Sequence, residues 1–163
     1  MRKKIIDVCC GVKMFYFDKN DSRVLFCDKR KIKTNLCDGR KFEVNPDCVC
    51  DFTDLPFPDK SFKMVVFDPP HLLKGTDAEP TGWQHIKYGC LQGNWKEMLR
   101  KWFEECFRVL DDYGFLIFKW NETDIRVCEI LKLTDKNPIF GHISGKRSNT
   151  HWICFMKEVN NAN

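Results

Sequence analysis

The sequence lacks several patterns that would assign it at once to a class of protein. No run approaches the roughly 18 apolar residues that a membrane span needs, so we expect no membrane partner. The apolar stretch behind the basic start is too short for a secretory signal, which favours a cytoplasmic protein. No GxGxxG follows the first apolar run, which argues against a nucleotide-binding oxidoreductase. Repeats and low-complexity segments are also absent, so we expect one domain over residues 1–157 and a disordered tail over 158–163.

The ten cysteines include no CxxC pair. Structural zinc sites usually use such pairs, and the spacings Cys9-Cys10 and Cys48-x-Cys50 differ from them. Most of the cysteines stand inside short apolar runs, which is typical of buried free thiols. The sequence therefore predicts no metal site and, without a secretion signal, no disulfide framework.

The composition is that of an ordered single domain with a small net positive charge. The chain has 163 residues, 43% of them hydrophobic, which is enough for a core. The net charge is +4, with basic clusters at residues 29–33 and at Lys146-Arg147. This excess is compatible with a nucleic-acid partner, but solvated surface lysines explain each cluster alone equally well.

Short, nearly continuous apolar runs predict parallel strands buried on both faces. These runs are residues 4–9, 23–27, 47–50, 63–67 and 115–118. Helices are expected at residues 94–110, where apolar residues recur every three or four positions behind Asn94 as N-cap, and at 123–133. Residues 138–144 and 151–157 predict a closing antiparallel hairpin. The fold class is therefore α/β, a Rossmann-like, doubly wound, mostly parallel sheet of seven strands with a C-terminal antiparallel hairpin.

Polar residues follow the first strands directly. Asp28, Asp51 and Asp68 each come after one, and Cys10-Gly11 follows the first of all. Each aspartate alone is more readily explained as a turn residue. In a doubly wound sheet, however, ligands bind outside the carboxyl ends of the strands, so three aspartates at that edge predict a ligand site.

The motifs at this edge resemble those of a known family. "DVCCG", the end of "VLFCD", "CDFTDLPFPDKSFKMVVFDPPH" and the closing hairpin resemble a class I S-adenosylmethionine-dependent methyltransferase over nearly the whole chain. "DPPH", residues 68–71, resembles the (Asp/Asn/Ser)-Pro-Pro-aromatic motif of amino-methyltransferases. The resemblance implies S-adenosylmethionine as cofactor and an exocyclic amine, N6 of adenine or N4 of cytosine, in DNA or RNA as target. Small proteins of this type also occur in phages and prophages.

The resemblance also implies cofactor contacts at the ends of the first three strands. Gly11 would let the backbone approach the methionine part, because it carries no Cβ. Asp28 would accept hydrogen bonds from the ribose hydroxyls, and Asp51 one from the adenine amine. The full set of expected cofactor-binding residues is Asp7, Cys9, Gly11, Asp28, Asp51, Phe52 and Leu55.

"DPPH" carries the expected catalytic residues Asp68, Pro69, Pro70 and His71. A base amine is a weak nucleophile, because its lone pair is delocalised into the ring. The carboxylate of Asp68 and the carbonyl of Pro69 would accept its two N–H groups and aim the lone pair at the methyl group. The prolines hold that carbonyl rigidly, so positioning supplies much of the rate. His71 would stack on the unpaired base.

Substrate contacts are expected from three other segments. Residues 72–93 predict a long loop, which we interpret as a lid carrying Trp83, His85 and Tyr88. Lys119 follows the fifth strand and faces the edge of the site. Lys146 and Arg147 lie in the turn of the closing hairpin, where phosphate contacts are expected.

Some features depart from the family pattern. Asp38-Gly39 and Asn45-Pro46 break helices, so the usual second helix is shortened or replaced by a hairpin. No separate target-recognition segment stands out, and a homodimer or a partner subunit could supply recognition. The alternatives are a small-molecule or protein methyltransferase, and a non-catalytic cofactor-binding subunit.

Overall fold

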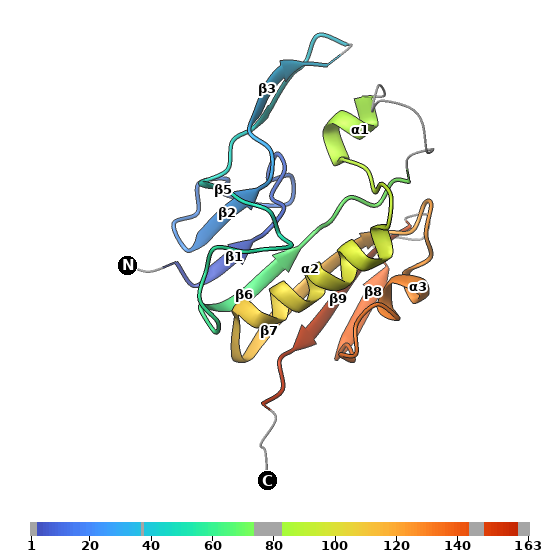
Figure 1. Cartoon of the computed structure of the whole chain (residues 1–163). Coiled ribbons are helices and arrows are strands. Elements are labelled where there is room, and N and C mark those ends of the chain that lie inside the picture. Colours follow the sequence, from blue (N-terminus) through green and yellow to red (C-terminus); the bar gives the residue numbers. More distant parts are fainter. Residues whose placement is uncertain (1–2, 37, 74–82, 144–148, 160–163) are drawn as a thin grey trace.

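A computed structural model describes residues 3–36, 38–73, 83–143 and 149–159 (Figure 1). Its main sheet has seven strands in the order β5-β2-β1-β6-β7-β9-β8. The pairs β1–β2, β1–β6, β2–β5 and β6–β7 are parallel, and β9 runs antiparallel to both β7 and β8. The strands are β1 (Ile5–Asp7), β2 (Val24–Asp28), β5 (Cys48–Val49), β6 (Phe62–Phe67), β7 (Leu110–Asn121), β8 (Phe140–Ile143) and β9 (Thr150–Met156). The predicted fold class is confirmed, including the closing hairpin.

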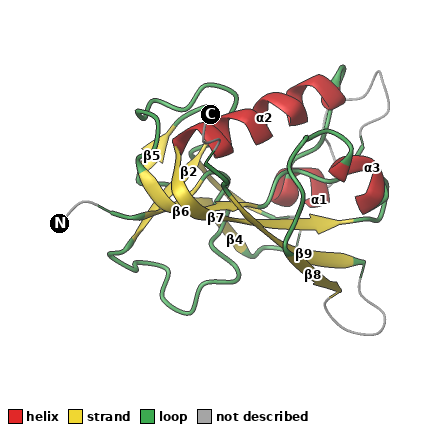
Figure 2. Cartoon of the chain, turned by 90° about the horizontal axis from the view of Figure 1, so that it is seen from below, coloured by secondary structure: helices red, strands yellow, loops and turns green. Residues whose placement is uncertain are grey.

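The core lies between this sheet and helix α2 (Trp95–Val109), which crosses it in Figure 2. The Asn94 side chain caps the helix by accepting a hydrogen bond from the Glu97 backbone N–H, as predicted. Phe103 presents its ring to Phe67 of β6 and Phe118 of β7 in edge-to-face contacts, with centroids 5.4 and 5.2 Å apart. The apolar face of α2 therefore holds β6 and β7 together.

The connections are less helical than strict strand–helix alternation would give. The described helices α1 (Trp83–Tyr88), α2 and α3 (Val127–Leu131) all follow β6, while residues 8–23 and 50–61 form loops. Within the described residues, no helix is long and apolar enough to cross a membrane. Residues 160–163 of the predicted tail lie outside the described residues.

A hairpin replaces the helix that usually follows the second strand, as the helix-breaking residues indicated. Its strands are β3 (Ile32–Asn35) and β4 (Lys41–Val44), paired antiparallel. The hairpin projects from the main sheet toward the side on which α1 lies (Figure 1).

Two predicted boundaries were wrong. Helix α3 begins at Val127 rather than near residue 123, because Asn121 accepts hydrogen bonds from Thr123 in a turn that precedes the helix. Strand β7 begins at Leu110 rather than at residue 115, so Gly114 lies within the strand. A Cβ at Gly114 would lie 2.9 Å from the carbonyl oxygen of Lys63, so glycine permits the close approach of β6 and β7 here.

We expect Leu99→Ala to destabilise the fold by about 2–5 kcal/mol, since this fully buried side chain of α2 would leave a cavity. Lys101→Ala, on the exposed face of the same helix, is the matched control and should change stability by less than about 0.5 kcal/mol. Urea unfolding followed by circular dichroism measures both. Equal effects would contradict the assignment of the core face.

Candidate active site

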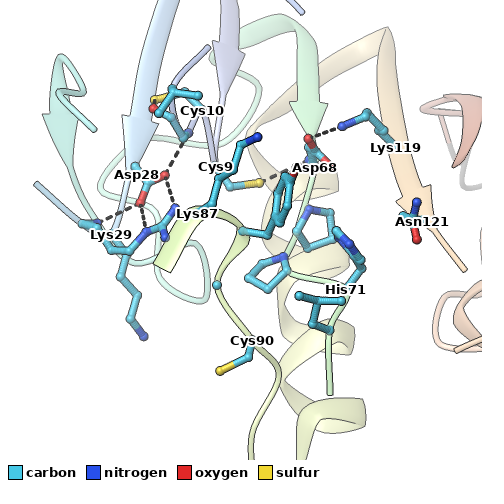
Figure 3. A pocket seen from close by; sticks show the side chains of 18 of the residues that line it. Cys9, Cys10, Asp28, Lys29, Asp68, His71, Lys87, Cys90, Lys119 and Asn121 are labelled. Atoms are coloured by element: carbon cyan, nitrogen blue, oxygen red, sulfur yellow. Dashed lines mark hydrogen bonds and ion pairs between the residues drawn. The ribbon is translucent and has the colours of Figure 1, made fainter. Parts of the chain in front are cut away.

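A cavity of about 890 Å³ lies at the carboxyl ends of β1, β2 and β6 (Figure 3). This volume is in the range of small-molecule and cofactor sites. The cavity brings together ten of the residues expected at the site: Cys9, Gly11, Asp28, Phe52, Asp68, Pro69, Pro70, His71, Tyr88 and Lys119. Residues distant in sequence thus meet at one edge of the sheet, as the strand order requires.

The turn after β1 folds onto the end of β2. Gly11 adopts a φ of +50°, which favours glycine, and its backbone N–H donates to Oδ2 of Asp28 at 3.0 Å. A Cβ at Gly11 would meet nothing within 4 Å, so this face of the turn borders open space. A ligand can therefore approach the backbone here.

Asp28 is buried and forms an ion pair with Arg30. Its Oδ1 accepts hydrogen bonds from the backbone N–H and from Nε of Arg30, at 2.9 and 3.1 Å. The same guanidinium donates through Nη1 to the carbonyl oxygen of Ile86 on α1, at 3.1 Å. Arg30 therefore links the end of β2 to α1 at the cavity.

Asp68 forms an ion pair with Lys119 across the ends of β6 and β7. Its Oδ2 accepts from the Lys119 ammonium at 2.7 Å, and its backbone N–H donates to Sγ of Cys9 at 3.2 Å. Oδ1 accepts no hydrogen bond from the described residues. Burial raises the pKa of Asp68 above its usual value, and the charge of Lys119 opposes this rise. One oxygen of a partly buried carboxylate is thus available to a substrate.

His71 and the segment after α1 close the same side of the cavity. The His71 ring lies 5.6 Å from the Tyr88 ring, centroid to centroid, and burial lowers its pKa, which favours the neutral imidazole. Gly89 has a φ of +73°, and a Cβ there would lie 3.0 Å from Cγ of Pro70. Glycine therefore allows this segment to rest directly on the Pro-Pro pair.

Three predicted cofactor residues do not line the cavity. Leu55 packs into the core, where its backbone N–H donates to Glu105. Asp51 stands at the rim, exposed, with Oδ1 bonded to Thr53 and Oδ2 3.6 Å from the Lys29 ammonium. Asp7 points beneath the first turn, where its Oδ1 accepts from the Cys9 backbone N–H at 3.1 Å.

Burial raises the pKa of Asp7 to about 7. The residue is the last of β1 and is completely buried. A carboxyl in this position supports the turn mechanically but cannot touch a ligand in the cavity.

The substrate-binding predictions are resolved only in part. Trp83 and His85 fall on α1, but their side chains lie outside the described residues, as do Lys146 and Arg147 altogether. The cavity also takes lining residues that were not proposed for binding, among them Met14, Phe15, Lys29, Arg30, Lys87 and Cys90. The sequence does indicate the pairing of Arg30, because it stands two residues after Asp28, within reach of its carboxylate. Phe15 had none, since it belongs to a loop without a pattern.

Comparisons with known proteins show the fold. No family model matches the chain, and no curated protein matches it. A S-adenosylmethionine-dependent methyltransferase of Methanosarcina mazei superposes with a TM-score of 0.56 at 12% identity, covering 98% of this chain and 95% of that one. A 1,6-didemethyltoxoflavin-N1-methyltransferase of Burkholderia thailandensis, solved with S-adenosylhomocysteine, superposes with a TM-score of 0.56 at 12% identity. The match covers 95% of this chain and 71% of that one.

A third similar structure is the Haloferax volcanii complex between the Trm112 methyltransferase activator and a methyltransferase. It gives a TM-score of 0.53 at 11% identity, with 99% and 85% of the two chains covered. At these identities the similarity concerns architecture. The chain has the Rossmann-like fold of class I S-adenosylmethionine-dependent methyltransferases.

We expect the stability of the protein to fall as the pH rises from about 4 to about 7, through the titration of Asp7. Its folded-state pKa is raised, so the folded protein holds this proton more tightly than the unfolded chain, and the stabilisation is lost as the proton leaves. Asp7→Asn mimics the protonated form. It should raise the melting temperature relative to the wild type at pH 8, but not at pH 4.

The matched control is Asp54→Asn, an exposed aspartate, which should shift the melting temperature equally little at both pH values. Thermal unfolding across the pH range measures the effect. If the difference between Asp7→Asn and the wild type does not depend on pH, Asp7 does not titrate in this window.

Proposed function

We propose that this protein binds S-adenosylmethionine and transfers its methyl group to an exocyclic amino nitrogen of adenine or cytosine in DNA or RNA. One observation carries the proposal. A single cavity is lined by Asp28 at the end of β2, by the Gly11 turn after β1 and by residues 68–71 after β6. The acidic cofactor residue and the amine-binding motif therefore face the same space, on either side of the turn. The methyltransferase fold of the neighbours supports the same cofactor.

The residues at the β2 side of the cavity fit a nucleoside. Asp28 supplies carboxylate oxygens for ribose hydroxyls, and Phe52 supplies a buried apolar wall for the adenine ring. Oδ1 of Asp28 already accepts from Arg30, so the ribose would take over part of those hydrogen bonds. Because Arg30 also holds the carbonyl of Ile86, nucleoside binding would loosen the link to α1. Bound S-adenosylmethionine would supply an electrophilic methyl group.

The residues at the β6 side fit an aromatic amine. Oδ1 of Asp68 is available to accept one N–H of the amine, and the carbonyl of Pro69 would accept the other. The charge of Lys119 opposes the rise that burial causes in the pKa of Asp68, and so favours the ionised form that accepts hydrogen bonds. His71 and Tyr88 present a partly exposed aromatic pair on which the base would stack. These residues position the nitrogen lone pair, so the catalysis we propose is mainly orientation.

Positive charge at the cavity favours a nucleic-acid substrate over a neutral one. Lys29 and Lys87 line the opening, and the neighbouring hairpin exposes Lys31, Lys33 and Lys41. Such side chains contact phosphates without reading sequence. Recognition of a particular site would then come from a second copy or a partner subunit, an arrangement supported by the activator complex of Haloferax volcanii.

The second candidate function is methylation of a small heterocycle. The enclosure of the cavity by α1 and by the segment that rests on Pro70 favours a compact substrate. The Burkholderia thailandensis structure contains such a substrate, 1,6-didemethyltoxoflavin. Methyl transfer from labelled cofactor to single-stranded DNA, structured RNA and free nucleobases distinguishes the two candidates.

The two aspartates should separate binding from transfer. We expect Asp28→Asn to weaken S-adenosylmethionine binding by about 10- to 100-fold, the effect of losing charged hydrogen bonds. Asp68→Ala should leave that affinity within about threefold but reduce transfer by at least about 100-fold, because only the amine depends on it. Calorimetric titration and a labelled-methyl assay measure the two quantities.

Asp124→Ala is the control, an exposed aspartate whose carboxylate accepts only from the Leu73 backbone near the cavity. It should bind the cofactor normally. Loss of cofactor binding in Asp68→Ala, or normal binding in Asp28→Asn, would reverse the assigned roles and count against the proposal.

Lys119→Met should move the acidic limb of the pH–rate profile to higher pH. The Asp68 carboxylate must be ionised to accept the amine, so activity is lost as the pH falls through its pKa. Removing Lys119 leaves burial unopposed and raises that pKa further. Lys87→Met, another lysine at the cavity, is the control, and its acidic limb should coincide with that of the wild type. Unmoved limbs in both variants would exclude Asp68 as the titrating group.

A further inference from the structure

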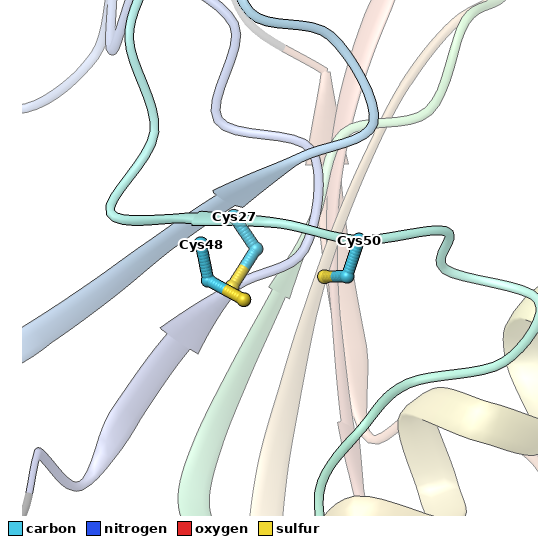
Figure 4. Close-up of side chains that lie close together, drawn as sticks. All are labelled: Cys27, Cys48 and Cys50. Atoms are coloured by element: carbon cyan, nitrogen blue, oxygen red, sulfur yellow. The ribbon is translucent and has the colours of Figure 1, made fainter.

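Three thiols meet on the outer part of the sheet, away from the lining of the cavity. Cys27 lies on β2, Cys48 on β5, and Cys50 just beyond the end of β5. Their Sγ atoms all lie within 4.8 Å of one another, and Figure 4 shows the three side chains directed into one small space. No CxxC pair marks this group in the sequence, because the sheet assembles it from neighbouring strands.

The arrangement follows from the strand geometry. Cys27 and Cys48 are direct partners in the parallel register of β2 and β5. Cys50 is two residues beyond Cys48, so in extended chain its side chain returns to the same face. Its backbone N–H also donates to the carbonyl oxygen of Asp28, at 3.2 Å, which continues the pairing past the end of β5. The backbone therefore holds all three sulfurs in place.

We propose that Cys27, Cys48 and Cys50 form a trithiolate site for one soft d¹⁰ metal ion, with Zn²⁺ as the physiological class. Thiolates are the ligands that such ions prefer, and three protein ligands with an open fourth position are a known zinc arrangement. With Zn–S distances of about 2.3 Å, tetrahedral ligands lie roughly 3.8 Å apart. Sulfurs within 4.8 Å of one another reach that separation by small side-chain rotations.

The environment allows an ion to enter and to be held. Cys27 is buried, but Cys48 and Cys50 are partly exposed at β5, the edge strand of the sheet. Metal binding would release the thiol protons to solvent, so affinity should increase with pH.

An ion here would brace the end of β2 just before Asp28. Cys27 precedes Asp28 and Cys50 precedes Asp51, so the site lies directly behind two residues at the nucleoside side of the cavity. Strand β5 has only two residues, and three metal–sulfur bonds would fix it to β2. We therefore expect the ion to stabilise the folded protein.

The test is a titration of the reduced, oxygen-free protein with Cd²⁺, followed by the thiolate-to-metal charge-transfer absorption, with Zn²⁺ as competitor and native mass spectrometry for stoichiometry. One ion per chain is expected, displaced by Zn²⁺. Cys48→Ser and Cys50→Ser should each weaken binding by more than about tenfold, since a lost ligand costs at least as much as a lost supporting contact. Cys128→Ser, exposed on α3, and Cys90→Ser, at the cavity, are the matched controls and should bind normally.

Thermal unfolding gives a second readout. Zn²⁺ should raise the melting temperature of the wild type and of Cys128→Ser, but not that of Cys50→Ser. No binding to the wild type, or equal binding by Cys50→Ser and the wild type, would overturn the inference. So would a reduced protein that binds no metal and instead forms a disulfide among these cysteines in air. Because none of these measurements involves methyl transfer, the site stands or falls independently of the proposed function.

Discussion

The placement of β1 between β2 and β6 is the constraint on which the site depends. Parallel pairing on both sides puts the carboxyl ends of all three strands at one edge, so the turn at Gly11 lies between Asp28 and Asp68. The hydrogen bond from Gly11 to Asp28 fixes this turn against β2, and the contact from Asp68 to Cys9 fixes it against β6. The buried Asp7 supports the same turn from beneath. One local geometry thus determines how far apart the two carboxylates stand.

Each carboxylate of the cavity is held by a cation from another position, and the two pairs have different consequences. Lys119 reaches Asp68 from the neighbouring strand β7, so it is held by the sheet and can preserve the charge of the carboxylate without closing the site. Arg30 follows Asp28 in the chain and reaches onward to α1, so it connects the occupancy of Asp28 to the position of a covering element. A ligand that competes with Arg30 for Asp28 therefore also affects the contact with α1. A ligand at Asp68 instead finds an acceptor that Lys119 already orients.

The sequence predicts correctly those elements that a single local pattern of apolar residues defines. Continuous apolar runs located the seven strands, and helical periodicity with Asn94 located α2 almost to the residue. The aspartates after β2 and β6 were found because strand ends share an edge. Leu55 was expected at the cofactor, but an apolar residue near the site packs as well in the core, where this structure has it. Phe15 lines the cavity from a loop, through tertiary contacts for which a single sequence carries no periodic signal.

The same reasoning explains why spacing along the chain does not reveal the group of Cys27, Cys48 and Cys50. Spacing along the chain is informative where the ligands come from one turn, but in a parallel sheet the relevant neighbours are set by register, here Cys27 opposite Cys48. Burial alone would account for each thiol separately, as small apolar side chains do. It does not account for three sulfurs converging at a two-residue edge strand, directly behind Asp28 and Asp51. A short edge strand has few hydrogen bonds of its own, so the residues that hold it to β2 also determine how firmly the β2 side of the cavity is held.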